Sequence, residues 1–207
     1  YDSVISNYFN EITNTQFPKK KTIHANLIEK LRYGENAHQQ SAIYSQKDNL
    51  GLIKLHGKTL SYNNYNDVFS ALSITKSFPK NVGTVIIKHA NPCGVSILKD
   101  KLKSYKSALA CDPLSAFGGV VSCNFKVSKS LALELNKIFF EVIIGNGFEK
   151  SAIKILKTKK NLRLIDASKY SRHKNLKFNS INSSVLIQSE DNKIFQKKNF
   201  RVVSKKK

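Results

Sequence analysis

The chain has 207 residues, of which 41% are hydrophobic and 10% aromatic, a composition that indicates a folded protein with one substantial core. No apolar run approaches the roughly 18 residues of a membrane span, and the N-terminus lacks the pattern of a signal peptide. The formal net charge is +21, but only four of the 35 basic residues are arginines and the lysines are scattered, so we do not expect nucleic acid to be the main partner.

The first third of the chain predicts a linker, a loop, a strand and a helix. Residues 1–22 form an amphipathic segment and a basic connector, which is typical of a linker between domains. Residues 34–40 are too polar and turn-rich for a core element and predict a loop. After a short strand, Gly57 predicts a tight turn, and a helix follows. We expect its cap within Asn63–Asn66, and its apolar face to include Val68, Leu72 and Phe78.

The stretch "GTVIIKHANPCGVS" begins as a strand, because its β-branched run has no polar alternation and is typical of a central strand covered on both faces. Lys88 and His89 follow at the point where this strand leaves the sheet. The carboxyl ends of strands in open α/β sheets are where ligands bind. The two side chains can act together only if the chain bends at once, and we expect Pro92 and Gly94 to supply that bend.

Helices and strands alternate through the rest of the chain up to residue 167. "KLKSYKSALACD" predicts a helix, "SAFGGVVSCNF" a turn into a strand, and the following stretch two further helices and the strands "EVIIG" and "LRLID". From Ser168 we expect irregular chain with one late strand, "SSVLIQ". This alternation favours a three-layer α/β domain with a mostly parallel or mixed sheet.

Four stretches carry candidate chemistry, and each has a structural alternative. His89 can serve as a general base and Lys88 can stabilise an oxyanion, but the pair is also compatible with a surface lysine beside a structural histidine. Arg32 and Tyr33 offer a fork for an anion and a face for a flat ring, or only an anchored loop.

The other two stretches are "CDPLSAFGG" and the start of "EVIIG". The glycines of the first permit close approach of a ligand to the backbone, or only a tight turn. Glu141, which begins the second, is an acceptor for an amine or hydroxyl if it lies in a site, and otherwise an ordinary carboxylate at the start of a strand.

The cysteines argue against a metal or disulfide protein. Cys93, Cys111 and Cys123 have no CxxC spacing, which favours a reducing cytoplasm. "NPCGVS" partly matches the zinc signature of cytidine deaminases, but Ser96 stands where the second cysteine belongs and no H-x-E precedes it, so we expect no zinc. The chain begins at Tyr1 and contains no methionine, so we expect it to be a piece of a longer protein.

Five stretches, in this order, resemble successive blocks of the bacterial bifunctional purine biosynthesis family, in which an inosine monophosphate (IMP) cyclohydrolase is joined to an aminoimidazole carboxamide ribonucleotide (AICAR) formyltransferase. They are "LRYGENAHQ", "LHGKTLSYNN", "IIKHANPCGV", "ACDPLSAFGG" and "FFEVIIG" with its continuation "AIKILKTKKNLRLI". The resemblance covers nearly the whole chain and falls on the first half of the formyltransferase domain.

The resemblance implies a three-layer cytidine-deaminase-like fold with a mixed sheet and without zinc. It implies that residues 1–22 are the linker from the missing cyclohydrolase domain, residues 23–167 the first formyltransferase subdomain, and residues 168–207 the start of the connection to the missing second subdomain. The implied reaction transfers a formyl group from the co-substrate 10-formyltetrahydrofolate to the 5-amino group of AICAR, with no metal in the active site, in a cytoplasmic homodimer whose sites form between subunits.

The resemblance also implies roles for individual residues. His89 is the base that removes a proton from the amine, and Lys88 stabilises the oxyanion and helps to protonate the folate nitrogen as it leaves. AICAR is contacted by Arg32, Tyr33, His89, the backbone of Gly118, and Glu141, with Asn91 as a helper.

Two departures qualify these expectations. Ala37 replaces the proline that usually follows "GEN" in this family, which loosens the loop of Arg32 and Tyr33. The chain also stops at Lys207, before the part of the family that carries further AICAR contacts and most folate contacts, so we expect the isolated chain to be inactive. The alternative is a basic nucleic-acid-binding module on a deaminase-like fold.

Overall fold

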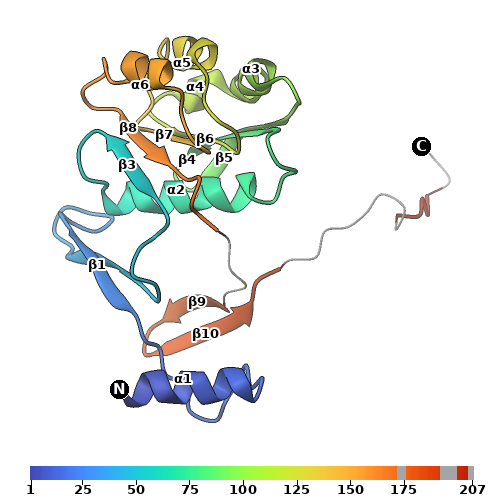
Figure 1. The fold of residues 1–207 in the computed structure, drawn as a ribbon. Helices are drawn as coiled ribbons and strands as arrows, with labels where there is room; N and C mark the ends of the chain where they lie inside the picture. The colour runs from blue at the N-terminus through green and yellow to red at the C-terminus, as the bar shows by residue number, and fades with distance from the viewer. Residues whose placement is uncertain (172–175, 192–199, 205–207) are drawn as a thin grey trace. The chain divides into compact units, whose positions relative to one another are not determined.

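The computed structural model describes residues 1–171, 176–191 and 200–204. The chain divides into two compact units, residues 1–171 and residues 172–207 (Figure 1). None of the helices in the described residues is long and apolar enough to cross a membrane.

A six-stranded mixed sheet forms the centre of the first unit (Figure 1). Its strand order is β3-β8-β7-β6-β4-β5. Strands β6, β7 and β8 run parallel, whereas β4 is antiparallel to both of its neighbours and β3 is antiparallel to β8, so the prediction of a mixed α/β sheet is confirmed. The strands are β3 (Ile53–His56), β4 (Gly83–Lys88), β5 (Asn91–Ile97), β6 (Val120–Cys123), β7 (Val142–Gly145) and β8 (Arg163–Asp166).

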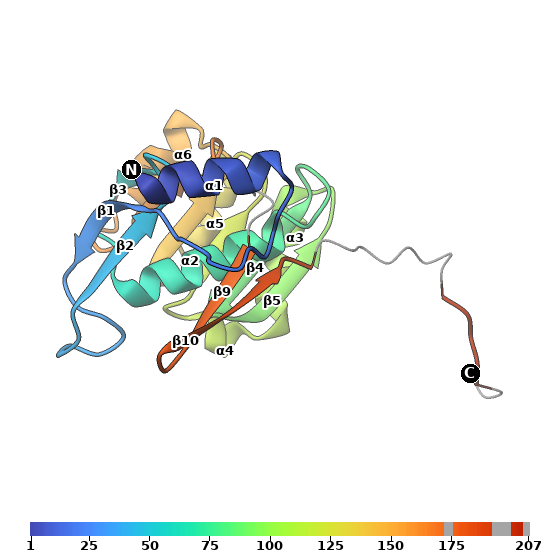
Figure 2. The same cartoon turned by 90° about the horizontal axis from the view of Figure 1, so that it is seen from below.

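Helices cover both faces of this sheet. Helix α2 (Tyr62–Thr75) crosses one face (Figures 1 and 2). The other face packs against α3 (Lys101–Cys111), α5 (Lys129–Leu135) and α6 (Lys150–Leu156), with the short α4 (Pro113–Ala116) beside them.

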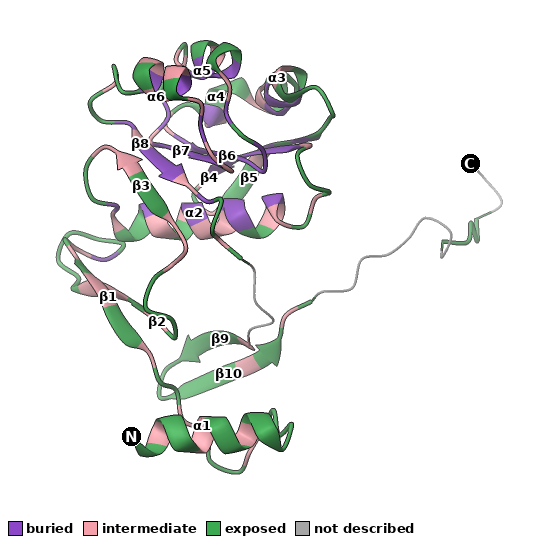
Figure 3. Ribbon diagram, viewed as in Figure 1, coloured by how far each residue is buried: buried purple, intermediate pink, exposed green. Residues whose placement is uncertain are grey.

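The alternating residues of β4 show how one strand serves two cores. Val85 and Ile87 pack on the α2 side, whereas Ile86 packs on the side of α3 and α5, and all three are fully buried. Buried residues accordingly concentrate in the strands and in the helix faces that cover them (Figure 3). The prediction that this strand is central and covered on both faces is confirmed.

The N-terminal cap of α2 differs from the prediction within Asn63–Asn66. The cap is Ser61, whose hydroxyl accepts from the Asn64 backbone N–H at 3.1 Å, while the Asn64 side-chain oxygen accepts from the Ser61 N–H at 3.3 Å. This is a reciprocal capping box in which an asparagine takes the third position. Val68 and Leu72 are buried as expected, and Phe78 packs against the same core from beyond the helix end.

The predicted bend at Pro92 and Gly94 is wrong, because both residues lie within strand β5. The chain reverses one step earlier, where His89 and Ala90 adopt left-handed conformations with φ of 53° and 60°. A proline is tolerated in β5 because this strand is at the edge of the sheet. Gly94 is required for packing instead, because a Cβ at this position would overlap the carbonyl oxygen of Ala108 in α3.

Five elements belong neither to the central sheet nor to the helices that cover it. Helix α1 (Asp2–Ile12) falls in the predicted linker and has no buried residue. Strands β1 (Asn26–Leu31) and β2 (Ser41–Ser45) form an antiparallel pair joined by the predicted loop. In the second unit, β10 (Ser184–Ser189) confirms the expected late strand, and β9 (Leu176–Ile181) is its unpredicted antiparallel partner.

Asn124 directly follows β6 and holds neighbouring backbone in place on the side of the sheet at which β6 ends. Its side-chain oxygen accepts from the backbone N–H groups of Val82 and Gly83 at 2.9 and 2.8 Å. Its amide nitrogen donates to the carbonyl oxygens of Pro79 and Thr75 at 2.8 and 3.3 Å. All four bonds hold the α2–β4 connection against the sheet, so this edge is occupied by structural contacts.

Candidate active site

The opposite edge of the sheet gathers several of the predicted residues in a row. Strand pairing places Ile87 opposite Val120, Val120 opposite Val142, and Val142 opposite Arg163. Because β4 is antiparallel to β6, the carboxyl end of β4 at Lys88 lies beside the amino ends of β6, β7 and β8. The expectation that ligands meet the carboxyl ends of strands therefore applies here to β4 and to β3, which is antiparallel to β8, whereas β6, β7 and β8 contribute the residues that precede them.

Lys88 and Gly118 lie next to each other at this edge. The ammonium of Lys88 donates to the carbonyl oxygen of Phe117. Gly118 has a φ of 71°, and a Cβ built on it would lie 3.4 Å from Lys88 Nζ. The Gly118 N–H is already used, because it donates to the Phe139 carbonyl oxygen at 2.8 Å. An ammonium has three donors, so Lys88 keeps two for a ligand.

His89 lies in a two-residue turn that joins β4 to β5. Lys88 pairs with Asn91, and both intervening residues have positive φ, which is the geometry of a type I′ hairpin turn. The Asn91 side-chain amide donates to the His89 carbonyl oxygen at 2.9 Å, and the imidazole is exposed. The Ala90 N–H donates to Asp67 Oδ1 at 2.6 Å, which ties the turn to helix α2.

The charges of His89 and Glu141 have opposite effects on the pKa of the Asp67 carboxyl. Partial burial raises the pKa of the Asp67 carboxyl above its usual value. The hydrogen bond from Ala90 and the charge of His89 oppose this rise in pKa, whereas the charge of Glu141 adds to it. The charges of both His89 and Glu141 thus act on the pKa of the Asp67 carboxyl.

Glu141 is held in place by its neighbours and is still accessible. Asn64 Nδ2 donates to Glu141 Oε2 at 2.7 Å, and Arg163 Nη1 lies 3.9 Å from the same oxygen. Arg163 Nε also donates to the Thr59 carbonyl oxygen at 3.3 Å. The Glu141 side chain is 43% exposed, so its second oxygen can accept from a ligand.

Arg32 and Tyr33 lie on the loop that follows β1. The Arg32 guanidinium carbon is 5.7 Å from the centre of the Tyr33 ring, and the Tyr33 carbonyl oxygen accepts from Ser41 Oγ at 2.7 Å. Asn63 Nδ2 donates to the Glu35 carbonyl oxygen at 3.3 Å, which links this loop to the start of α2. Within the described residues, no hydrogen bond or ion pair joins Arg32 or Tyr33 to the residues gathered at the sheet edge.

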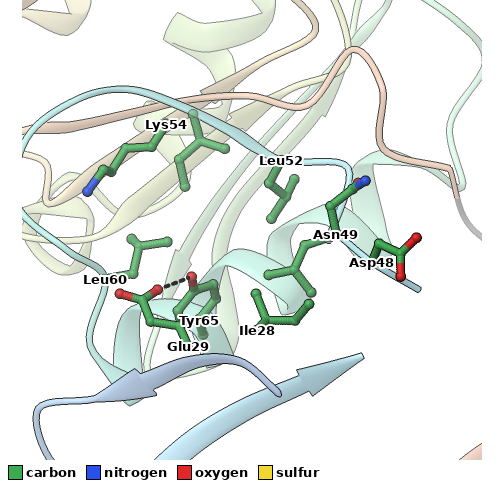
Figure 4. A pocket seen from close by; sticks show the side chains of 10 residues that line it. Ile28, Glu29, Asp48, Asn49, Leu52, Lys54, Leu60 and Tyr65 are labelled. Carbon is green, nitrogen blue, oxygen red and sulfur yellow. Dashed lines mark hydrogen bonds between the residues drawn. The ribbon is translucent and has the colours of Figure 1, made fainter. Parts of the chain in front are cut away.

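A pocket of about 210 Å³ lies between β1, β3 and α2, and none of the predicted site residues lines it (Figure 4). Its lining combines Ile28, Leu52 and Leu60 with the polar pair Glu29 and Tyr65. The Tyr65 hydroxyl donates to Glu29 Oε2 at 3.0 Å. Burial and the adjacent Glu29 carboxylate raise the pKa of Tyr65 to about 12.

Three further residues at this edge, Asn64, Asp67 and Arg163, were not predicted as site residues from the sequence. The first two are three residues apart in "SYNNYND" and share a helix face with the buried Val68 and Ala71. Polar residues on the core side of an amphipathic helix were the available signal. Across the residues for which the structure gives a description, no group of three or more His, Cys, Asp or Glu side chains could hold a metal ion.

Comparisons with known proteins match the whole chain. The "Bifunctional purine biosynthesis protein PurH" of Oceanobacillus iheyensis is 38% identical over 212 residues, covering 100% of this chain and 41% of the relative. The proteins of the same name from Bradyrhizobium diazoefficiens and a Bacillus cereus strain are each 40% identical, covering 100% and 92% of this chain and 40% and 38% of the relatives.

The chain thus spans about two fifths of the length of these relatives. The family described as "AICARFT/IMPCHase bienzyme" matches residues 1–207. The chain belongs to the AICARFT/IMPCHase bienzyme family.

Proposed function

We propose that this chain is the first part of an AICAR formyltransferase and acts in the synthesis of IMP, with 10-formyltetrahydrofolate as formyl donor. The observation that carries this proposal is the row of Lys88, His89, Gly118 and Glu141 at one edge of the sheet. These residues come from three of the stretches that resemble the formyltransferase, and their chemistry suits transfer of a formyl group to an amine.

The reaction needs a base and a cation. His89 takes a proton from the 5-amino group of AICAR while that nitrogen bonds to the formyl carbon. Lys88 stabilises the negative charge that develops on the formyl oxygen and delivers a proton to N10 of the folate as the bond between N10 and the formyl carbon breaks. The products are formyl-AICAR and tetrahydrofolate, and the proton taken by His89 balances the proton delivered to N10.

The remaining residues bind the nucleotide. Glu141, which Asn64 orients, accepts from an N–H of AICAR. Gly118 allows the ligand to approach the backbone beside Lys88, and Asn91 supports the turn that carries His89. Arg32 and Tyr33 approach AICAR from the loop after β1. Because they make no bond to the sheet edge among the described residues, we propose that they meet the other groups only through the ligand.

We further propose the domain division implied by the sequence. Residues 1–22 are the linker from a cyclohydrolase domain, residues 23–167 the first formyltransferase subdomain with a cytidine-deaminase-like fold, and residues 168–207 the start of the connection to a second subdomain. The second subdomain supplies most folate contacts, and two subunits of a cytoplasmic homodimer complete each site. Formyl transfer by the 207-residue chain alone would contradict this division.

The proposal is tested by calorimetric titration of the chain with AICAR. We expect saturable binding that His89→Ala weakens at least tenfold. His24→Ala is the matched control, because His24 is also exposed but precedes β1 and lies outside the sheet edge. Equal affinity of the two variants would contradict a role of His89 in AICAR binding. Binding of an oligonucleotide that falls steeply with salt and ignores His89→Ala would favour the nucleic-acid-binding alternative.

A further inference from the structure

We propose that Asp67 is a positioning residue whose carboxylate holds the His89–Ala90 turn in its left-handed conformation and thereby fixes the direction of the imidazole. Its importance for catalysis rests on the proposed role of His89. The effect on the turn itself does not, and can be measured without any ligand.

The turn needs such support because its two residues are poorly suited to it. A type I′ turn requires positive φ at both central positions, and glycine, asparagine and aspartate are the usual occupants. Here the positions are filled by His89 and Ala90, with φ of 53° and 60°. Alanine has a Cβ and no side-chain oxygen that could compensate locally, so the surrounding structure must stabilise this conformation.

Asp67 supplies the stabilising contact. Its Oδ1 accepts from the Ala90 N–H at 2.6 Å, a short, charge-assisted bond. A second contact, from the Asn91 side chain to the His89 carbonyl oxygen at 2.9 Å, closes the turn from the other side.

Helix α2 gives Asp67 a rigid base. Val68, the next residue, is fully buried, and the capping box at Ser61 and Asn64 fixes the start of the helix. Asn64 lies one helical turn before Asp67 and donates to Glu141. One face of α2 therefore orients both the proposed base, through Asp67, and the proposed acidic contact, through Asn64, so their separation is set by a single helical turn.

The test compares variants of the 207-residue chain by NMR, using the amide shift of residue 90 and the backbone carbon shifts of residues 89 and 90. Asp67→Asn keeps an oxygen acceptor, and we expect it to retain the left-handed shifts. Asp67→Ala should lose them and move the residue 90 amide signal upfield. Adding Ala90→Gly to Asp67→Ala should restore the left-handed shifts of His89, because glycine adopts positive φ without strain. Asp100→Ala, which removes the cap of α3, controls for general loss of stability and should leave the turn unchanged.

Unchanged turn shifts in Asp67→Ala would overturn the proposal. If Asp67→Ala does not fold, the double variant decides: a folded double variant supports a role in the turn, and an unfolded one assigns Asp67 to the stability of the whole domain and overturns the proposal. AICAR affinity should follow the same order, with a loss of at least tenfold in Asp67→Ala and recovery in Asp67→Asn. Absence of AICAR binding by the unsubstituted chain would count against the proposed function and leave the NMR result standing.

Discussion

Asn64 Nδ2 donates to Glu141 Oε2 at 2.7 Å, while the oxygen of the same side chain accepts from the Ser61 N–H in the cap of α2. One asparagine, only 3% exposed, therefore joins the start of a helix to the start of β7. The stability of the domain and the geometry of the candidate site therefore depend on the same side chain.

Replacing Asn64 should lower both the free energy of unfolding and the affinity for AICAR. Asn64→Ala removes two side-chain hydrogen bonds at a buried position, and we expect a loss of about 1–3 kcal/mol in the free energy of unfolding. Urea unfolding followed by circular dichroism measures this. Asn66→Ala is the matched control, because Asn66 is exposed in the same helix. Equal midpoints for the two variants would contradict the contact.

Gly94 should tolerate no side chain. A Cβ at this position would overlap the Ala108 carbonyl oxygen, and neither strand β5 nor helix α3 can move without disturbing the core between them. We expect Gly94→Ala to lower stability by about 3 kcal/mol or more. Val95→Ala, at the neighbouring exposed position, should have a much smaller effect on the melting temperature. A Gly94→Ala variant as stable as Val95→Ala would show that the two elements pack less closely.

The three cysteines should react with iodoacetamide in a fixed order. Cys111 is exposed, Cys93 is half-buried, and Cys123 is fully buried in the core. Burial raises the pKa of the Cys93 thiol and raises that of Cys123 to about 12, so the reactive thiolate is scarce at both. Mass spectrometry of the native chain should find Cys111 modified first and Cys123 modified only after denaturation. Early labelling of Cys123 would contradict the buried position of β6.

Tyr65 should make the chain less stable in alkali. Its folded pKa is about 12, above the ordinary value of 10.0, so its contribution to stability is complete below pH 10 and is lost as the pH rises toward 12. Urea unfolding at pH 9 and pH 11 should show a smaller loss for Tyr65→Phe than for the unsubstituted chain. Tyr62→Phe, at an exposed position in the same helix, is the control and should behave like the unsubstituted chain.

The sequence predicted those elements whose burial pattern is unmistakable. β4 and the strands from β6 to β8 are short apolar runs, and α3 has apolar residues at helical spacing. β5 was missed because it contains Pro92 and Gly94, which ordinarily signal a turn. β1 and β2 were missed because they contain no buried residue and lack a regular alternation of burial.

The residues of the candidate site were predictable from the sequence where a local motif marks them. They were not predictable where only the pairing of the strands brings them together. Lys88 and His89 were found because they end a buried strand. The left-handed turn at His89 and Ala90 has no local signal, since neither residue is glycine or asparagine, and its cause lies 23 residues away at Asp67. The antiparallel placement of β4, which brings Glu141 and Gly118 beside Lys88, depends on strand pairing that no single stretch encodes.

The two sides of the sheet at which the strands begin and end differ in how well they tolerate amino-acid substitutions. At one edge the four bonds of Asn124 tie down the α2–β4 connection, so almost any replacement there threatens folding. At the other edge, the side chain of the exposed His89 can change while the core stays intact, whereas Glu141 is bonded to the buried Asn64. New specificity can therefore be selected at the second edge without first rebuilding the scaffold, which makes this sheet a favourable starting point for directed evolution.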